Sequence, residues 1–283
     1  MIAEPEGRIE TGSVEVDGIS SFFRRIPGEG PPTVFVHGVP DHSGQWIPFL
    51  ERAAGPALAF DLPGFGRSDR PAPDRFDSSV TSYGDFVGRA LDELGVGEYG
   101  LVVHDWGTVG LLEAQRRPER VRRLCVINAV PLLPGYRWHR TARIWRTRRL
   151  GELSTRMFNR RSLSLGLRES RGDWSAPPAE FIDMIIEHLD RGTFDSILRL
   201  YRSADPDVLE RLGRDLGSIE APGLVLWSSK DRYLPLRFGP AYAEALGDGR
   251  FEELDGLGHW PWLEDPSVTD RVIRFMEGSE KLA

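Results

Sequence analysis

The stretch Leu101-Val-Val-His-Asp-Trp-Gly-Thr108 decides the fold, because a run of strand-forming residues leads into a sharp turn at Asp105 and a glycine follows two positions later. A turn of this kind between strand and helix exposes the side chain at its apex, and it is usually built as G-x-S-x-G with serine at the centre. Here aspartate occupies the centre, and Val103 stands where the first glycine would be. The pattern predicts a nucleophile elbow that presents a carboxylate, provided that the chain also supplies a base, an orienting acid and an oxyanion hole.

The composition is that of a globular protein. The chain has 283 residues, of which 40% are hydrophobic, and this is enough for a sizeable core. Met1 to Glu10 contains no apolar signal region, and no later stretch is apolar over the roughly 18 residues that a membrane helix needs. We therefore expect a soluble, cytoplasmic protein with no integral membrane segment. The single cysteine, Cys125, lies in an apolar run and is expected to be a buried structural thiol.

Charge is distributed unevenly along the chain. The formal net charge of -7 argues against general nucleic-acid binding. Between Arg137 and Arg171, however, there are eleven arginines and only two glutamates. A solvated helix face is the simplest interpretation of this stretch, and an anionic substrate, a membrane surface or an acidic partner are the alternatives.

Strand and helix patterns alternate through most of the chain. Residues 13–25 are expected to form a hairpin that turns at Asp17-Gly18 and supplies the antiparallel edge of a sheet. The alternation predicts a mostly parallel sheet covered by helices on both faces. Further strands are expected over 32–37, 57–61, 99–104, 123–128, 223–228 and 250–254, with helices from about 45 and over 79–94, 107–116, 237–246 and 266–276.

An arginine-rich insert without a strand pattern interrupts this alternation. Residues 131–217 contain helix formers, with Pro177-Pro178 and Asp205-Pro206 as helix breakers. We expect a helical cap, or lid, inserted after the sixth strand and placed over the carboxyl ends of the strands, where reactive residues collect in α/β sheets. Residues 1–130 and 218–283 would then form the core domain.

Two further reactive residues follow strand ends. Asp231 lies just beyond the strand expected at 223–228, and His259 lies in a loop after the last strand. The chain order of nucleophile, acid and histidine is the order found in α/β-hydrolases. Three residues at three matching positions are a stronger signal than any one of them.

Five segments resemble the α/β-hydrolase fold: His37-Gly-Val-Pro40, Asp61-Leu-Pro-Gly-Phe-Gly-Arg-Ser-Asp69, Val103-His-Asp-Trp-Gly107, Lys230-Asp231 and Gly258-His259-Trp260. Within that fold they look most like the epoxide hydrolases and haloalkane dehalogenases, which use aspartate as the nucleophile. The resemblance covers residues 10–130 and 217–278 closely, and the insert only loosely.

The resemblance implies a two-step reaction that needs neither a cofactor nor a metal. The carboxylate of Asp105 would attack a tetrahedral carbon and form an alkyl ester. Water would then hydrolyse the ester, with His259 as general base and Asp231 holding its tautomer. The backbone N–H groups of Val39 and Trp106 are the candidates for the oxyanion hole. The other histidines are expected to be structural or unremarkable: His37, His42, His104, His139 and His188.

The cap decides which leaving group is expected. Tyr201, in Leu198-Arg-Leu-Tyr-Arg202, resembles the segment that holds a ring-opening tyrosine in epoxide hydrolases, and Tyr136 is a candidate second donor. A halide would instead need indole N–H donors such as those of Trp106, Trp138 or Trp145.

Val39 has no side-chain donor, although many dehalogenases carry asparagine there. We therefore favour opening of an epoxide to a diol, with haloalkane dehalogenation as the alternative and a non-catalytic binding protein as a third possibility. The substrate is expected to be a small apolar molecule with an electrophilic carbon, in contact with Trp106, Tyr136 and Trp138.

Overall fold

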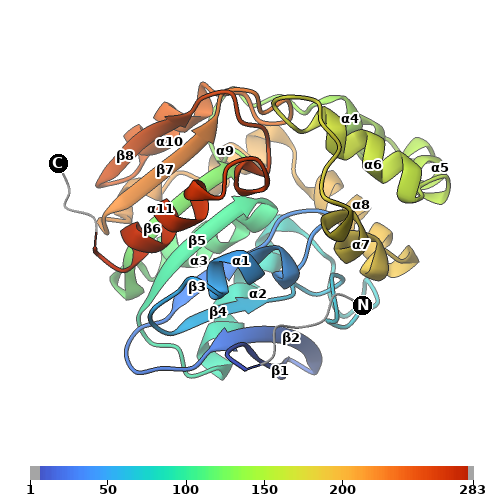
Figure 1. Cartoon of the computed structure of the whole chain (residues 1–283). Helices are drawn as coiled ribbons and strands as arrows, with labels where there is room; N and C mark the ends of the chain where they lie inside the picture. Colours follow the sequence, from blue (N-terminus) through green and yellow to red (C-terminus); the bar gives the residue numbers. More distant parts are fainter. Residues whose placement is uncertain (1–6, 280–283) are drawn as a thin grey trace.

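A sheet of eight strands forms the centre of the computed structural model, which describes residues 7–279 (Figure 1). The spatial order is β1-β2-β4-β3-β5-β6-β7-β8. The fold is therefore the mostly parallel α/β sheet predicted from the alternating pattern. The strands are β1 (Glu10–Val16), β2 (Ile19–Ile26), β3 (Thr33–Val36), β4 (Ala57–Phe60), β5 (Tyr99–Asp105), β6 (Val121–Ala129), β7 (Gly223–Ser228) and β8 (Gly249–Leu254).

The hairpin β1–β2 forms one edge of the sheet, as predicted. Its strands pair antiparallel from Glu10↔Arg25 to Val16↔Ile19, and β2 pairs antiparallel with β4. The turn residues Asp17 and Gly18 both have positive φ, 51° and 71°. This is the conformation that a two-residue turn needs to follow the twist of its strands. From β4 to β8 all strand pairs are parallel.

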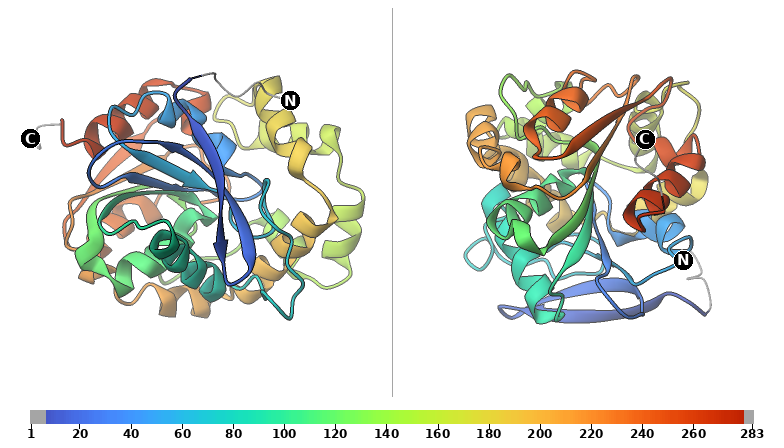
Figure 2. Two further views of the ribbon diagram at one scale, coloured as in Figure 1. Left: turned by 90° about the horizontal axis from the view of Figure 1, so that it is seen from below. Right: turned by 90° about the vertical axis from the view of Figure 1, so that its left-hand side faces the viewer.

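Side chains of the central strands alternate between two hydrophobic clusters, one on each face of the sheet. In β3, Val34 and Val36 belong to one cluster and Phe35 to the other, and in β5 Val103 and Val102 divide in the same way. A strand that buries both faces must be covered on both sides, because successive side chains point in opposite directions. The two views in Figure 2 show the helices on either side of the sheet.

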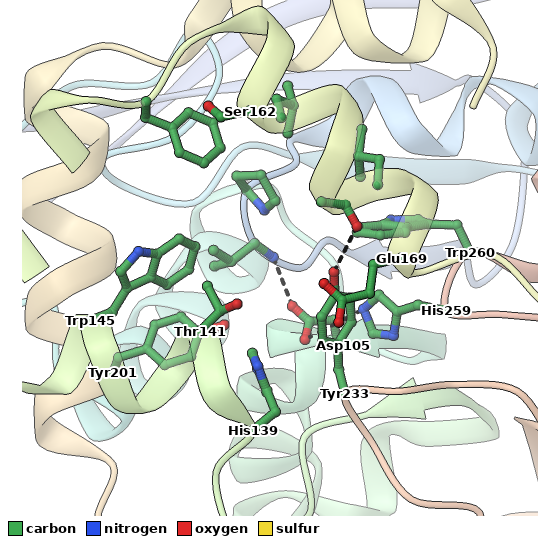
Figure 3. A pocket seen from close by; sticks show the side chains of 16 residues that line it. Asp105, His139, Thr141, Trp145, Ser162, Glu169, Tyr201, Tyr233, His259 and Trp260 are labelled. Carbon is green, nitrogen blue, oxygen red and sulfur yellow. Dashed lines mark hydrogen bonds and ion pairs between the residues drawn. The ribbon is translucent and has the colours of Figure 1, made fainter. Parts of the chain in front are cut away.

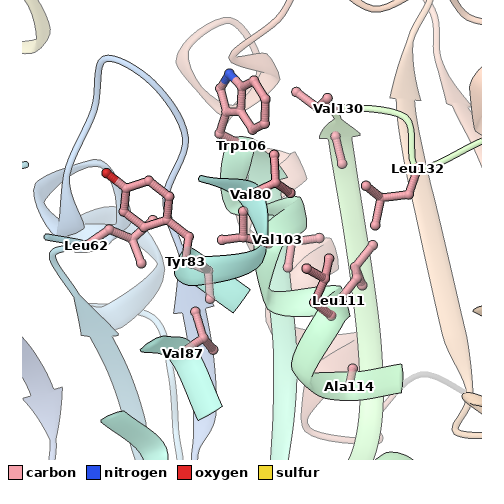
Figure 4. Packing of buried hydrophobic residues seen from close by; sticks show 14 of the residues in the cluster. Leu62, Val80, Tyr83, Val87, Val103, Trp106, Leu111, Ala114, Val130 and Leu132 are labelled. Carbon is pink, nitrogen blue, oxygen red and sulfur yellow. The ribbon is translucent and has the colours of Figure 1, made fainter. Parts of the chain in front are cut away.

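Five helices provide that cover. α1 (Ile47–Leu50) and α11 (Ser267–Met276) lie on the face of Phe35. α2 (Val80–Glu93), α3 (Gly110–Arg116) and α10 (Phe238–Ala245) lie on the other. Figure 4 shows part of this second cluster, where Tyr83 and Val87 of α2 and Leu111 of α3 pack near Val103. Cys125 is buried on the same face of the sheet as Phe35, as predicted.

Six helices follow β6 and precede β7. The first five lie beyond the carboxyl ends of the parallel strands, whereas the last packs beside α3 (Figure 1). The helical insert after the sixth strand is thus present where the sequence predicted it. Within residues 7–279 no helix is both long and apolar enough to cross a membrane. The six helices are α4 (Arg140–Arg146), α5 (Leu150–Arg156), α6 (Arg160–Glu169), α7 (Ala179–His188), α8 (Arg191–Ser203) and α9 (Pro206–Leu212).

Candidate active site

Asp105 ends β5 at a strained turn, and a 3₁₀ turn (Trp106–Val109) leads from it into α3. Its φ of 50° and ψ of -121° are unusual for a residue with a side chain. Gly107 permits this turn, because a Cβ there would stand 2.1 Å from the carbonyl oxygen of Val36. Gly38 allows the loop after β3 to approach the turn, because a Cβ at position 38 would lie 2.5 Å from Cβ of Asp105. The local structure is therefore the elbow that the sequence predicted.

The two oxygens of the Asp105 carboxylate have different neighbours. Oδ1 accepts a hydrogen bond of 2.9 Å from the backbone N–H of Val39, and the backbone N–H of Trp106 also stabilises the carboxylate. Oδ2 lies 3.8 Å from Nε2 of His259. One oxygen is thus held by fixed donors, and the other faces the histidine.

Asp231 and His259 form a tight buried pair. Oδ2 of Asp231 lies 2.7 Å from Nδ1 of His259, and Oδ1 of Asp231 accepts hydrogen bonds from the backbone N–H groups of Tyr233 and Leu234. Because Asp231 has acceptors only, Nδ1 of His259 carries a proton, and this leaves Nε2 for the side of Asp105. The three residues expected from their strand-end positions are therefore brought together.

Burial and charge shift the acidities of this group in opposite directions. Burial raises the pKa of Asp105 to about 6, although the charge of His259 and the two backbone N–H groups act to lower it. Burial by itself lowers the pKa of His259, but the carboxylates of Asp231, Asp105 and Asp41 outweigh it, so the pKa is raised overall. The site thus holds a carboxylate that ionises near neutral pH beside a strengthened base.

Asp41 is a buried carboxyl that sequence reasoning missed. Its Oδ2 accepts a hydrogen bond of 2.7 Å from the indole N–H of Trp260, while its Oδ1 is buried without a partner among the described residues. Burial raises the pKa of Asp41 to about 7, and the charge of Asp105 adds to the effect. An acid directly after Pro40 was the only signal in the sequence, and it did not indicate burial.

The loop that carries His259 is fixed by two polar residues at neighbouring strand ends. Asn128 donates from Nδ2 to Oγ of Ser228 and to the carbonyls of Gly258 and His259. His104 lies 2.9 Å from the same His259 carbonyl, and burial lowers its pKa well below the usual range. His104 is therefore neutral and positions the loop, in agreement with the structural role expected for it.

His37 is also structural, as predicted. Its Nδ1 lies 2.8 Å from the carbonyl oxygen of Gly38, and its Nε2 accepts from the backbone N–H of Leu62. In residues 7–279 no group of three or more His, Cys, Asp or Glu side chains is arranged to hold a metal ion.

A cavity lies between the elbow and the cap helices (Figure 3). Asp105 and His259 line it from the core side, and Tyr201 of α8 and Trp145 of α4 line it from the cap side. Burial, followed by the charge of Asp105, raises the pKa of Tyr201, so its phenol stays protonated. The structure thus brings a buried tyrosine into the same cavity as Asp105.

His139 also lines this cavity, although its spacing in the sequence gave no reason to select it. Nδ1 of His139 accepts from the backbone N–H of Ala142 at the start of α4, and burial lowers its pKa to about 4. A neutral His139 with Nδ1 occupied carries its proton on Nε2. His139 is therefore an additional donor beside Tyr233, whose ring it contacts at 4.8 Å.

The other expected contact residues form a wall behind Tyr201. The ring of Trp106 lies 5.0 Å from that of Tyr201 and stacks on Trp138 at 5.5 Å, and Tyr136 packs against Trp138. The indole N–H of Trp138 donates to the carbonyl of Ala204, and the buried indole N–H of Trp106 is directed to the hydroxyl of Tyr201, whose pKa it acts to lower. The hydroxyl of Tyr136 is buried without a partner among the described residues. Trp106, Tyr136 and Trp138 are absent from the lining of the cavity itself.

Comparison with known proteins identifies the family of this chain. Residues 33–271 match the model of the "Alpha/beta hydrolase family". An epoxide hydrolase from Caballeronia sordidicola is 24% identical over 320 residues, which cover 98% of this chain and 96% of that protein. A haloalkane dehalogenase from Mycolicibacterium paratuberculosis (strain ATCC BAA-968 / K-10) is 41% identical over 106 residues, which cover 36% of this chain and 35% of that protein.

Solved structures share the same architecture. The crystal structure of haloalkane dehalogenase DbeA from Bradyrhizobium elkani USDA94 superimposes with a TM-score of 0.79 at 23% sequence identity. The match covers 96% of this chain and 100% of that chain. This chain is therefore similar both to proteins named epoxide hydrolase and to proteins named haloalkane dehalogenase, the two groups that the sequence resemblance implied.

Proposed function

The chain belongs to the alpha/beta hydrolase family and is an enzyme of this kind, and on that premise we propose that it opens an epoxide to a diol through an alkyl ester on Asp105. The observation that supports this choice is that Tyr201 and Asp105 line one cavity. The departing oxygen of an epoxide is an alkoxide and needs a proton donor, which the protonated phenol of Tyr201 supplies.

In the first step, Oδ2 of Asp105 attacks one carbon of the epoxide in line with the C–O bond that breaks. The electron pair of that bond stays on the oxygen, which takes the proton of Tyr201. Oδ1, held by the N–H of Val39, becomes the carbonyl oxygen of the ester. The product of this step is a hydroxyalkyl ester of Asp105 beside a tyrosinate.

In the second step, water attacks the carbonyl carbon of that ester. His259 takes the proton of the water through Nε2, and Asp231 stabilises the imidazolium through Nδ1. The negative charge that develops on Oδ1 is stabilised by the N–H groups of Val39 and Trp106. The bond between Cγ and Oδ2 then breaks, and Oδ2 leaves with the diol and takes the proton held by His259. The oxygen of the water remains in Asp105, and the second proton of the water returns to Tyr201.

Formation of the ester itself prepares the base for the second step. The charge of Asp105 is one of the carboxylate charges that raise the pKa of His259. Esterification removes that charge, so the pKa of His259 falls and its neutral, basic form becomes more populated. The free carboxylate of Asp105 therefore favours the charged form of His259, and the ester favours the neutral form.

An isotope experiment tests the alkyl ester. With enzyme in excess over a small apolar epoxide in ¹⁸O-water, we expect the diol of the first turnover to carry no label, because its new oxygen comes from Asp105. After many turnovers the diol is expected to be labelled. Label in the first diol would show direct attack by water and would refute the ester.

A second experiment tests the leaving group and the part played by Tyr201. Tyr201→Phe should slow diol formation by about 10²–10⁴-fold. Tyr136→Phe, which also removes one buried hydroxyl but outside the lining of the cavity, should have a much smaller effect. Equal losses in the two variants would contradict the role given to Tyr201.

Haloalkane dehalogenation is the second candidate, and the buried indole N–H of Trp106, which neighbours the hydroxyl of Tyr201, is the donor that favours it. A halide site needs more than one weak donor, and the N–H of Trp138 is occupied by Ala204. Release of halide from a bromoalkane without diol formation from epoxides would decide for this reaction. Tight binding of both substrates without any product would instead indicate a non-catalytic binding protein.

The helices between β6 and β7 are proposed to act as the cap domain. Residues 131–217 supply Tyr201, Trp145 and His139 to the cavity. Residues 1–130 and 218–283 supply Asp105 and His259 to it, together with Asp231, which holds His259 without lining the cavity. On this division the core performs the ester chemistry, and the cap selects the substrate and donates the proton.

A further inference from the structure

The outer side of α5 and α6 carries apolar side chains that are exposed to solvent. Within residues 7–279 the large hydrophobic side chains that stand exposed all belong to α5, α6 and the segments that directly follow these two helices. They are Leu150 (54%), Leu153 (55%), Met157 (69%), Leu165 (66%) and Trp174 (56%). Single exposed apolar residues are ordinary, but their restriction to one part of a protein marks an interaction surface.

The spacing of these residues places them on one side of each helix. Leu150 and Leu153 are three positions apart on α5, and Met157 directly follows that helix, four positions after Leu153. On α6, Leu165 lies four positions after Arg161 and three before Arg168. Residues at these intervals share a helix face. We call the two faces, with Arg148 and Arg149 in the turn before α5, the cap tip.

The arginines of the cap tip have no acidic partners. Among the described residues, the side chains of Arg148, Arg149, Arg161 and Arg168 form no ion pair and no hydrogen bond, whereas neighbouring Arg160 is paired with Asp183. The chain as a whole has a net charge of -7, so this positive surface opposes the overall balance. A second copy of the same face would set arginine against arginine, so the charge of the cap tip favours an acidic partner.

We propose that the cap tip docks on a lipid bilayer that contains anionic headgroups. Exposed leucine and methionine side chains enter the boundary between headgroups and acyl chains, and guanidinium groups bind the phosphates. This inference goes beyond the proposed function, because it concerns where the protein binds and holds whatever the leaving group.

The position of α6 gives such docking a consequence for substrate entry. Arg161, Leu165 and Arg168 lie on its outer side, whereas Ser162, Leu163 and Gly166 line the cavity that contains Asp105. An α-helix with side chains is about 10 Å across. Docking therefore brings the wall of the cavity within one helix diameter of the lipid, where small apolar molecules accumulate.

Vesicle sedimentation with the purified full-length protein tests the proposal. We expect binding to phosphatidylcholine vesicles that contain about one third phosphatidylglycerol, much weaker binding to phosphatidylcholine alone, and release at high salt because exposed charges are screened. Near an anionic surface each arginine contributes about fivefold to binding. Arg161→Glu/Arg168→Glu should therefore weaken binding by at least about 25-fold.

A matched control and a second variant make the result specific. Arg211→Glu/Arg214→Glu carries the same charge change on exposed residues at α9, away from α5 and α6 in Figure 1, and should bind almost like the wild type. Leu153→Asp/Leu165→Asp should weaken binding even at low salt, because the apolar contact is lost. The melting temperature of each variant shows whether it is folded.

Trp174 provides a readout that needs no variant in the cap tip. It is the exposed member of the eight tryptophans, and the other seven are buried. Lipids brominated in their acyl chains should quench its fluorescence in anionic vesicles and leave it unquenched in neutral ones. Absence of binding to anionic vesicles would overturn the proposal, as would equal losses in the two arginine variants. A lipid-free dimer abolished by Leu153→Asp would assign the face to a second copy instead.

Discussion

Replacement of Asp105 by asparagine should stabilise the fold while it abolishes turnover. The pKa of Asp105 is about 6, compared with 3.8 for an unperturbed aspartate, and a tenfold change in ionisation constant corresponds to about 1.36 kcal/mol. An ionised Asp105 therefore costs the folded state about 3 kcal/mol at pH 8, when the carboxyl is ionised in both the folded and the unfolded chain. Asparagine keeps an oxygen acceptor for the N–H of Val39 and carries no charge.

The pH dependence of this gain identifies its cause. Because the folded pKa is higher than the unfolded one, the wild type is least favoured above pH 6 and recovers stability as the pH falls from 6 to 4. The advantage of Asp105→Asn should therefore shrink from about 3 kcal/mol at pH 8 to about 1 kcal/mol at pH 4.5. For a chain of this size, 3 kcal/mol corresponds to a rise in melting temperature of roughly 6–12 °C.

Calorimetric melting of both proteins at pH 8 and pH 4.5 measures the effect. The control is Asp248→Asn, an exposed aspartate in the loop before β8, for which a change within about 0.5 kcal/mol is expected. The reasoning is refuted if Asp105→Asn is no more stable than the wild type at pH 8. It is also refuted if the gain is the same at both pH values.

Three further outcomes follow from the geometry of the site. His259→Gln should still form the ester but hydrolyse it at least about 100-fold more slowly, so that mass spectrometry finds one substrate adduct on Asp105; continued rapid turnover would contradict the role of His259. Because Asp41 adds to the pKa of His259, Asp41→Asn should move the acid limb of ester hydrolysis to lower pH, and a limb that stays in place would show that Asp41 acts only in packing. Gly107→Ala should lower stability by about 1–3 kcal/mol, because the added Cβ would meet the carbonyl of Val36. Gly166→Ala should raise stability by about 0.5–1 kcal/mol, because the added Cβ in α6 would stand in open space. Thermal melting of the two variants compares these effects.

The core of the fold could be predicted from the sequence because it is specified by local residue patterns. The Asp17-Gly18 hairpin, the alternation of strand and helix, and the turn at Asp105 each depend on residues adjacent in the chain. The meeting of Asp105, Asp231 and His259 then follows from topology, because the ends of neighbouring parallel strands lie at one edge of the sheet.

The residues that were missed depend on packing between distant segments. Asp41 is buried in contact with Trp260, more than two hundred positions later, which donates a hydrogen bond to it. His139 enters the cavity because of how α4 docks on the loop at Tyr233. The rotation of Trp138, whose N–H binds Ala204 instead of facing the cavity, is likewise set by the contact between two cap segments. No local sequence pattern encodes these orientations.

The parallel pairing of β6 with β7 carries a consequence for how this architecture evolves. Leu124 pairs with Gly223, so a crossover connection must join the two strands whatever its length. The 93 residues between Ala129 and Gly223 form that connection. Each doubling of the length of a flexible connection costs only about 0.6 kcal/mol in loop-closure entropy. Selection can therefore enlarge, shorten or replace the crossover at little thermodynamic penalty to the sheet. One catalytic frame can in this way acquire new substrate ranges by exchange of a single connection.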